Sequence, residues 1–153
     1  MTRLAVFLAT AGYSGYFPVA PGTVGSAVGL LAYALVRWAG SEVFEVVSIV
    51  GLFAAGVWAG TTAERYFGGI DPGPVVLDEV VGMLVTLLWI PVGLTGAIAG
   101  FVLFRIFDVI KPFPARRLES LHGGLGVMAD DAMAAIYANL TLRLLLWLFP
   151  SLI

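Results

Sequence analysis

Apolar stretches without a charged residue recur along the chain, separated by short polar segments. Residues 46–63 form one such stretch of 18 positions, which reaches about 27 Å as a helix and can just cross a bilayer core of about 30 Å. A longer stretch, residues 80–104, is divided by Pro91 and Gly93. The pattern predicts an all-α, polytopic helical membrane protein with about five transmembrane or re-entrant helices. These helices are expected over residues 24–38, 46–63, 78–90, 94–108 and 128–148.

The charges in the connecting segments favour two short crossings over one long crossing for residues 80–104. With two crossings, the N-terminus, the 64–78 loop and the 109–127 loop share one side of the membrane. That side then carries most of the basic residues, as the positive-inside rule expects of the cytoplasm. A single crossing would separate Asp78 from Asp108 by a membrane thickness. The basic residues on the shared side are Arg3, Arg65, Lys111, Arg116 and Arg117.

The two short crossings are shorter than a bilayer core. Helices of 13 to 15 residues reach only about 20–23 Å, so they must thin the bilayer or lie in a protein-lined basin. A re-entrant hairpin would satisfy the same charges.

Glycine and proline interrupt the apolar segment before the first predicted span. Residues 5–26 contain two prolines among several glycines, which remove amide donors and admit positive φ angles. We predict an irregular Gly/Pro-rich loop here. We expect residues 12–22 to pack beside a site, because non-helical backbone at membrane depth must pack on protein or line a wet cavity. The alternative is a simple turn before a helix, with Thr23 or Ser26 as its N-cap. Residues 4–11 make a poor signal peptide and are expected to remain in the mature protein.

Composition also indicates a membrane protein. Hydrophobic residues make up 60% of the chain and the mean hydropathy is +1.00, whereas soluble domains are about 45–50% apolar. The length suits one domain over residues 1–153. A net charge of −2 gives no electrostatic footprint for nucleic acid. Cysteine is absent, so carboxylates must carry any metal.

Acidic residues recur at the same ends of the predicted helices. Carboxylates brought together near lipid repel one another unless a cation joins them. Oxygen ligands, with no cysteine and one histidine, favour Mg²⁺, Mn²⁺ or Ca²⁺ over zinc. Adjacent helical residues point about 100° apart, so we expect one member of each acidic pair to face the site and the other to face a partner. The acidic elements are Asp78–Glu79, Asp108 and Asp130–Asp131.

The alternative for these acids is local pairing with a nearby base. Residues three apart share one face of a helix. On this interpretation Asp108 pairs with Arg105 or Lys111, and Glu119 pairs with Arg116.

Basic side chains beside the acids are candidates for binding phosphate. A guanidinium toward the membrane interior, like that of Arg105, is retained only with a partner, and its planar fork suits phosphate oxygens. Lys111 and Arg116 extend this positive field, although a juxtamembrane basic cluster that attracts anionic lipid explains Arg116 equally well. His122 could act as an acid or base, contact a headgroup, or be structural. The candidate phosphate or headgroup contacts are Arg105, Lys111, Arg116, His122, Thr23 and Ser26.

Four sequence blocks, in order, resemble those of the phosphatidylglycerophosphatase A family. They are APGTVGS (20–26), LDEVVGM (77–83), FRIFDVIKPFPAR (104–116) and HGGLGVMADD (122–131). The resemblance implies a Mg²⁺-dependent membrane phosphatase of phospholipid biosynthesis, which converts phosphatidylglycerophosphate to phosphatidylglycerol and inorganic phosphate. It also implies a bacterial cytoplasmic (inner) membrane protein whose active site faces the cytoplasm.

The resemblance further implies roles for individual residues. Arg105 and Lys111 are placed toward the phosphate. It leaves open whether one or two ions bind, and whether an aspartate forms a phosphoenzyme or orients water. The candidate catalytic residues are Asp78, Glu79, Asp108 and Asp131, and the candidate metal ligands are these four with Asp130.

Two functions from other classes compete with this interpretation. Acids and broken helices are also expected of a small membrane cation transporter or channel, but here the charges cluster at one face and there is no inverted repeat. A non-catalytic lipid-binding subunit would explain the basic cluster and leave five acids without a role. Release of phosphate with and without Mg²⁺ separates the three functions.

Overall fold

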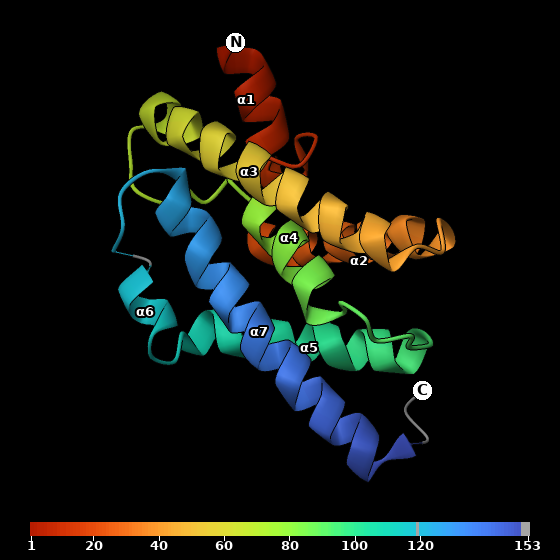
Figure 1. Ribbon diagram of the computed structural model, residues 1–153. Coiled ribbons are helices and arrows are strands. Elements are labelled where there is room, and N and C mark those ends of the chain that lie inside the picture. Colours follow the sequence, from red (N-terminus) through yellow and green to blue (C-terminus); the bar gives the residue numbers. More distant parts are fainter. Residues whose placement is uncertain (119, 151–153) are drawn as a thin grey trace.

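The computed structural model describes residues 1–118 and 120–150. Within these residues every regular element is a helix, which confirms the all-α class (Figure 1). The elements are α1 (Thr2–Ala9), the short 3₁₀ helix η1 (Ser14–Tyr16), α2 (Pro21–Trp38), α3 (Glu42–Phe67), α4 (Leu77–Thr86), α5 (Leu94–Ile110), α6 (Ala115–Leu118) and α7 (Gly124–Leu148).

The N-terminal segment is more helical than predicted. The irregular loop expected over residues 5–26 is wrong at both ends, because α1 covers Thr2–Ala9 and α2 begins at Pro21. No glycine or proline occurs in α1, and its alanines and leucines favour a helix. Proline is accepted at the first helical position because its missing N–H would have no partner there. Thr23 and Ser26 therefore lie inside α2 and do not cap it.

Two helices in the described part of the chain, α3 and α7, are long and apolar enough to cross a membrane. Both begin before their predicted starts. The first turn of α3 includes Glu42 and Glu45, because Ser41 caps it by accepting a hydrogen bond from the Phe44 N–H at 3.3 Å, and because acidic residues are favoured at this positive end of a helix. The helices at the other predicted spans do not combine that length with that hydropathy.

The long apolar stretch divides into α4 and α5, on either side of Pro91 and Gly93. Helix α4 has ten residues, about 15 Å, and ends before residue 90, where the prediction placed its end. The residue before a proline is disfavoured in helical conformation, and Trp89 has a positive φ of 57°. Helix formation therefore stops several residues before Pro91.

Helix α4 lies at the centre of the molecule, where it packs against α2, which passes behind it in Figure 1, and against α7, which runs beside it. Glycines on α2 permit a close approach to α4. A Cβ on Gly25 would lie 2.7 Å from Val76 Cβ, and one on Gly29 would lie 2.6 Å from Met83 Cβ, both closer than packed side chains tolerate. The first turn of α4 is thereby carried into the protein interior.

Side chains of α7 satisfy the backbone where α4 ends. The Asn139 amide donates to the carbonyls of Val85, Thr86 and Leu88 at 3.2, 2.9 and 3.2 Å. Arg143 also donates to the Leu88 carbonyl, at 2.9 Å. Unpaired backbone groups are costly in apolar surroundings. These bonds therefore allow a helix to stop inside an apolar protein.

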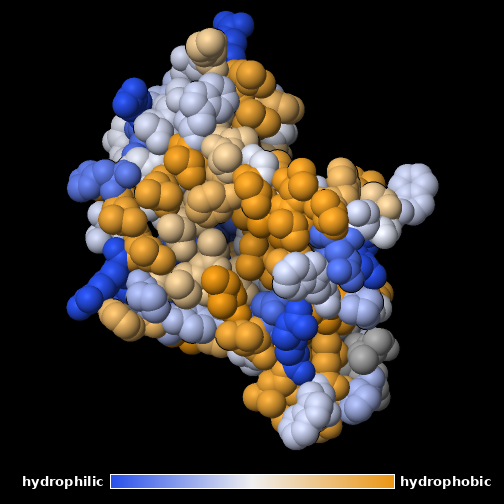
Figure 2. Space-filling view, in the orientation of Figure 1, coloured by the Kyte–Doolittle hydropathy of each residue, from blue (hydrophilic) through white to orange (hydrophobic). Residues whose placement is uncertain are grey.

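Apolar side chains cover much of the outer surface, as the visible face in Figure 2 shows. Leu31, Val50 and Leu140 are each at least 60% exposed. Soluble monomers rarely expose apolar patches of such extent. This surface, together with two helices able to cross a bilayer, indicates a membrane protein.

Candidate active site

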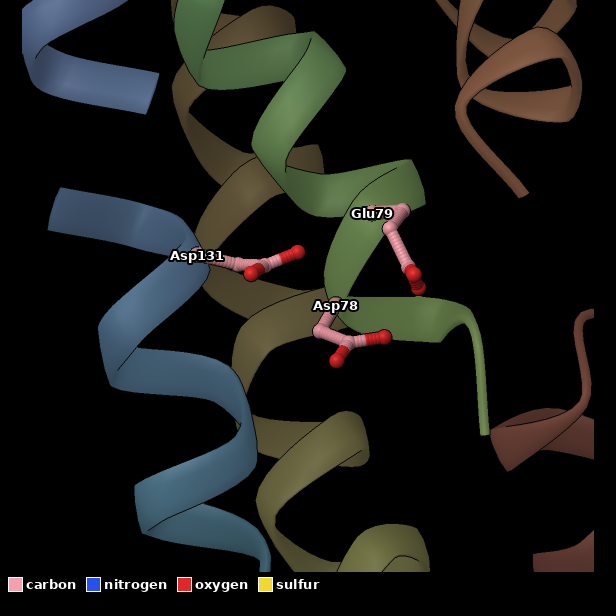
Figure 3. Close-up of side chains that lie close together, drawn as sticks. All are labelled: Asp78, Glu79 and Asp131. Carbon is pink, nitrogen blue, oxygen red and sulfur yellow. The ribbon is translucent and has the colours of Figure 1, made fainter. Parts of the chain in front are cut away.

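Three carboxylates from two helices meet beside the start of α4. Asp78 and Glu79 lie in the first turn of α4, and Asp131 extends toward them from α7 (Figure 3). One ligand atom from each lies within 4.8 Å of the others. Asp78 and Asp131 are buried, with 6% and 3% of their surface exposed. The arrangement is that of a group that could hold a metal ion.

Several oxygens of this group have no hydrogen-bond partner. In the described part of the chain, Asp78 Oδ1, Glu79 Oε2 and Asp131 Oδ2 are buried without one. A buried carboxylate oxygen without a partner is costly, and three neighbouring negative charges repel one another. A divalent cation would relieve both costs, and carboxylate oxygens are ligands that hard cations prefer. The residues present therefore fit a metal site.

Asp78 and Glu79 both belong to this group, so the expectation that only one member of an adjacent pair faces the site is wrong for them. The expectation holds for the other pair, because Asp131 joins the group while Asp130 accepts a hydrogen bond from Lys111 Nζ at 2.5 Å. Asp130 Oδ1 remains buried without a partner.

Arg105 connects three helices at the edge of the acidic group. Its Nη1 lies 2.8 Å from Asp108 Oδ2, 3.8 Å from Glu79 Oε1 and 3.4 Å from Ser26 Oγ. The predicted local pairing of Arg105 with Asp108 is thus present, and the same guanidinium also reaches an acid of the trio. Asp108 interacts electrostatically with Asp131 and Glu79. Arg105 therefore offers positive charge directly beside the candidate metal ligands.

Glycine is required where α2 meets this site. A Cβ on Gly22 would lie 2.3 Å from Glu79 Oε1 and 3.1 Å from both terminal nitrogens of Arg105. Just before it, Ala20 has a positive φ of 49°. Earlier in the same segment, Gly15 packs against the Pro74 carbonyl. The turns between α1 and α2 thus lie against the segment that enters α4.

Three other candidate residues lie apart from the trio. Within the described residues, Arg116 and His122 make no hydrogen bond or ion pair with these acids. Thr23 is exposed and lines an apolar cavity beside Arg105. The predicted pairing of Glu119 with Arg116 lies outside the described residues.

Asp71 is a further acidic residue near the site that was not predicted from the sequence. It lies in the turn before α4 with a positive φ of 46°, and it interacts electrostatically with Asp78 and Asp130. The glycines and prolines around Asp71 are typical of an ordinary turn, so the sequence offers no reason to expect a role in the site. The one indication was that Asp71 lies seven residues before Asp78.

A sequence model of phosphatidylglycerophosphatase A matches residues 7–146. The chain belongs to the phosphatidylglycerophosphatase A family. The match includes the carboxylate trio and Arg105, and it confirms the family resemblance of the four sequence blocks. No solved structure matches the chain.

Relatives of the chain come from several bacteria. A Bacteroides thetaiotaomicron protein named a putative phosphatidylinositol-3-phosphatase is 38% identical over 94% of both chains. The phosphatidylglycerophosphatase A of Escherichia coli is 35% identical over 80% of this chain and 72% of its own length. That of Haemophilus influenzae is 39% identical over 82% of this chain and 78% of its own length.

Proposed function

We propose that this protein is a Mg²⁺-dependent phosphatidylglycerophosphatase, which hydrolyses phosphatidylglycerophosphate to phosphatidylglycerol and inorganic phosphate. The observation that carries the proposal is the buried carboxylate trio beside Arg105, in a membrane protein of the phosphatidylglycerophosphatase A family. A transporter or a lipid-binding subunit would not need unpaired metal-ligand oxygens and a guanidinium together at one helix end.

Asp78, Glu79 and Asp131 are the residues that would hold Mg²⁺. Their free oxygens are the hard ligands that Mg²⁺ prefers. The chemistry that Mg²⁺ supplies in such a site is stabilisation of the charge that develops on the phosphoryl oxygens. The ion pairs at Asp108 and Asp130 lie beside the trio, so these two acids contribute as neighbours of the site or as additional ligands.

Arg105 would bind the phosphate through its planar fork. Asp108 and Ser26 hold that guanidinium in place, while Lys111 adds positive charge beyond Asp130. One carboxylate among Asp78, Glu79, Asp108 and Asp131 would act as the base. It would accept a proton from the attacking water while the water oxygen bonds to phosphorus. The bond between phosphorus and the glycerol oxygen then breaks, and the carboxylate passes the proton to the departing alcohol.

We also propose that residues 1–153 form one integral-membrane phosphatase domain with five crossings. Contacts between helix ends support this topology: Arg105 near the end of α5 meets the starts of α2 and α4, and Thr61 near the end of α3 bonds to Gly124 at the start of α7. Arg65 in the last turn of α3 and Lys111 at the end of α5 lie at these helix ends, and such basic residues favour the cytoplasmic side of a bacterial inner membrane.

Phosphate release by the purified protein tests the proposal. We expect turnover of phosphatidylglycerophosphate that requires Mg²⁺ and is lost in excess EDTA. Phosphatidylinositol 3-phosphate belongs in the same assay, because the name of one relative refers to that substrate. Preference for the inositol lipid would replace the substrate assignment. Absence of phosphate release from either lipid would favour the transporter or lipid-binding alternatives, and full turnover in EDTA with metal-free protein would remove the metal.

A further inference from the structure

Two apolar cavities lie one after the other between α2 and α5. The first, of about 490 Å³, is lined by Thr23 on α2 and by a face of α5 that includes Arg105 and Val109. The second, of about 700 Å³, is lined by residues from Ala27 to Arg37 on α2 and by the start of α5. The two helices run in opposite directions (Figure 1), so the cavities follow one another from the acidic site toward the far end of α2.

Helical spacing places the linings of these two cavities in line along the same faces of α2 and α5. Thr23 and Ala27 are four residues apart and therefore stand one above the other on α2. Ala97 in the second cavity and Phe101 in the first have the same relation on α5. The small side chains of Ala27, Ala34 and Ala97 leave space between the two helices. We name this surface the α2–α5 groove.

The groove is apolar along its length and open to the outside. Val109 and Leu94, near its two ends, are 75% and 78% exposed, and both face the cavities. Arg37 lines the second cavity, and its guanidinium forms an ion pair with Glu45 at 2.9 Å. Its charge is therefore neutralised by a neighbouring residue. Such a surface fits hydrocarbon and not a polar ligand.

Arg105 joins the α2–α5 groove to the candidate active site. The same side chain that lines the first cavity contacts Asp108 and Glu79. A lipid whose phosphate lies at this guanidinium would therefore have the groove beside its glycerol. From Thr23 to Ala34 the helix rises about 17 Å, close to the roughly 15 Å of one leaflet of the hydrocarbon core.

We propose that the α2–α5 groove holds one acyl chain of the phosphomonoester lipid while its phosphate lies at Arg105. The substrate would then enter laterally from the bilayer, between α2 and α5. This inference rests on the proposed function for the headgroup, and it adds the site that binds the chain.

The test fills the groove and compares long-chain with short-chain substrates. Ala27→Trp places a bulky ring between the two cavities, and the matched control Ala54→Trp places the same ring at an exposed position on α3. We expect Ala27→Trp to lower the ratio of kcat/KM for the diacyl lipid to kcat/KM for a dibutyryl analogue by about tenfold or more, the order expected when several buried methylenes are lost. Ala54→Trp should leave the ratio unchanged. An unchanged ratio in Ala27→Trp would overturn the inference.

Photolabelling gives a second readout that needs no turnover. A phosphatidic acid with a diazirine near the end of one acyl chain should label α2 and α5 peptides of the wild-type protein in detergent. Unlabelled phosphatidic acid should compete, and diacylglycerol should not, because the groove selects a chain whose phosphate is bound. Equal competition by both lipids would mark the groove as ordinary lipid-facing surface and overturn the inference.

These readouts separate the inference from the function on which it rests. If the wild-type protein hydrolyses neither substrate, the proposed function fails and the labelling result alone decides the groove. If Ala27→Trp does not fold, as judged by size-exclusion chromatography and thermal unfolding, Ala34→Trp replaces it farther along the groove, and the competition result in wild-type protein still decides.

Discussion

Three carboxylates with ligand atoms within 4.8 Å of one another in a protein interior lower the stability of the folded state. Such an arrangement indicates a functional role. Asp78 and Asp131 are nearly fully buried, and each has an oxygen without a partner. Like charges at this separation destabilise the folded state in the absence of a cation. Buried acids that are crowded by like charges are typical of functional sites. At the scale of single residues, stability and function should therefore respond in opposite directions.

Replacing Asp131 with Asn tests that opposition. We expect turnover of phosphatidylglycerophosphate to fall by at least about a hundredfold, the order seen when a group that stabilises transition-state charge is lost. The melting temperature in EDTA should stay the same or rise, because one buried negative charge has been removed. Mg²⁺ should raise the melting temperature of the wild-type protein and not that of the variant.

Glu42→Gln is the control for Asp131→Asn, since Glu42 is exposed at the opposite end of α3 from this site. It should leave both quantities unchanged. An Asp131→Asn protein with wild-type turnover would return Asp131 to a purely structural role.

Gly22→Ala tests how closely α2 must approach the site. The added Cβ would lie 2.3 Å from Glu79 Oε1, so the carboxylate and Arg105 must shift. We expect kcat/KM to fall about tenfold or more, because small displacements of positioning groups are costly in catalysis. The matched control is Gly51→Ala on α3, where a Cβ meets no atom of the described residues within 4 Å and alanine should stabilise the helix by up to about 1 kcal/mol. Equal activity of the two variants would contradict the packing at Gly22.

At the scale of elements, the short helix α4 is the main departure from a simple bundle of spanning helices. Its ten residues place the acids of its first turn inside the protein, and its other end depends on Asn139 and Arg143. The sequence could predict a break here from Pro91 and Gly93. It could not predict where α4 ends, because that depends on donors located about fifty residues later in the chain. Similarly, only tertiary packing decides that Asp78 and Glu79 both lie beside Asp131.

Asn139→Leu tests the support at the end of α4. The substitution keeps the side-chain size and removes an amide that donates to three carbonyls. We expect a loss of about 1–3 kcal/mol in the free energy of unfolding, the cost of leaving buried polar groups without partners. Thermal and denaturant unfolding in detergent measure it.

The control for Asn139→Leu is Thr62→Val, since among the described residues the Thr62 hydroxyl donates only to the Trp58 carbonyl of its own helix, at 3.2 Å. It should change stability by no more than about 0.5 kcal/mol. Equal stability of the Asn139→Leu and wild-type proteins would mean that water or lipid satisfies these carbonyls.

At the scale of the whole molecule, charge distribution was the most informative part of the sequence. The expectation that Asp78 and Asp108 lie at the same helix ends came from the charges of the connecting segments, and in the structure Arg105 contacts both Asp108 and Glu79, the neighbour of Asp78. The helical start at residues 2–9 was missed, because the glycines and prolines that follow dominated the prediction for the whole segment. The charge pattern thus predicted which helix ends meet better than it predicted the boundaries of each helix.

The five-crossing topology predicts which residues face each side of the membrane. The chain has no cysteine, so single-cysteine variants can be labelled without background. Ile70→Cys and Phe113→Cys, at positions 61% and 69% exposed, should resist a membrane-impermeant maleimide in intact cells and react in inverted vesicles. Trp38→Cys, at a position 88% exposed, should show the opposite pattern, because α2 has by then crossed the bilayer.

Pro91→Cys should show the same labelling pattern as Trp38→Cys if α4 and α5 form two full crossings. Protection of Pro91→Cys from both sides would indicate a re-entrant hairpin, and labelling of Ile70→Cys and Phe113→Cys in intact cells would place the active site on the outer face.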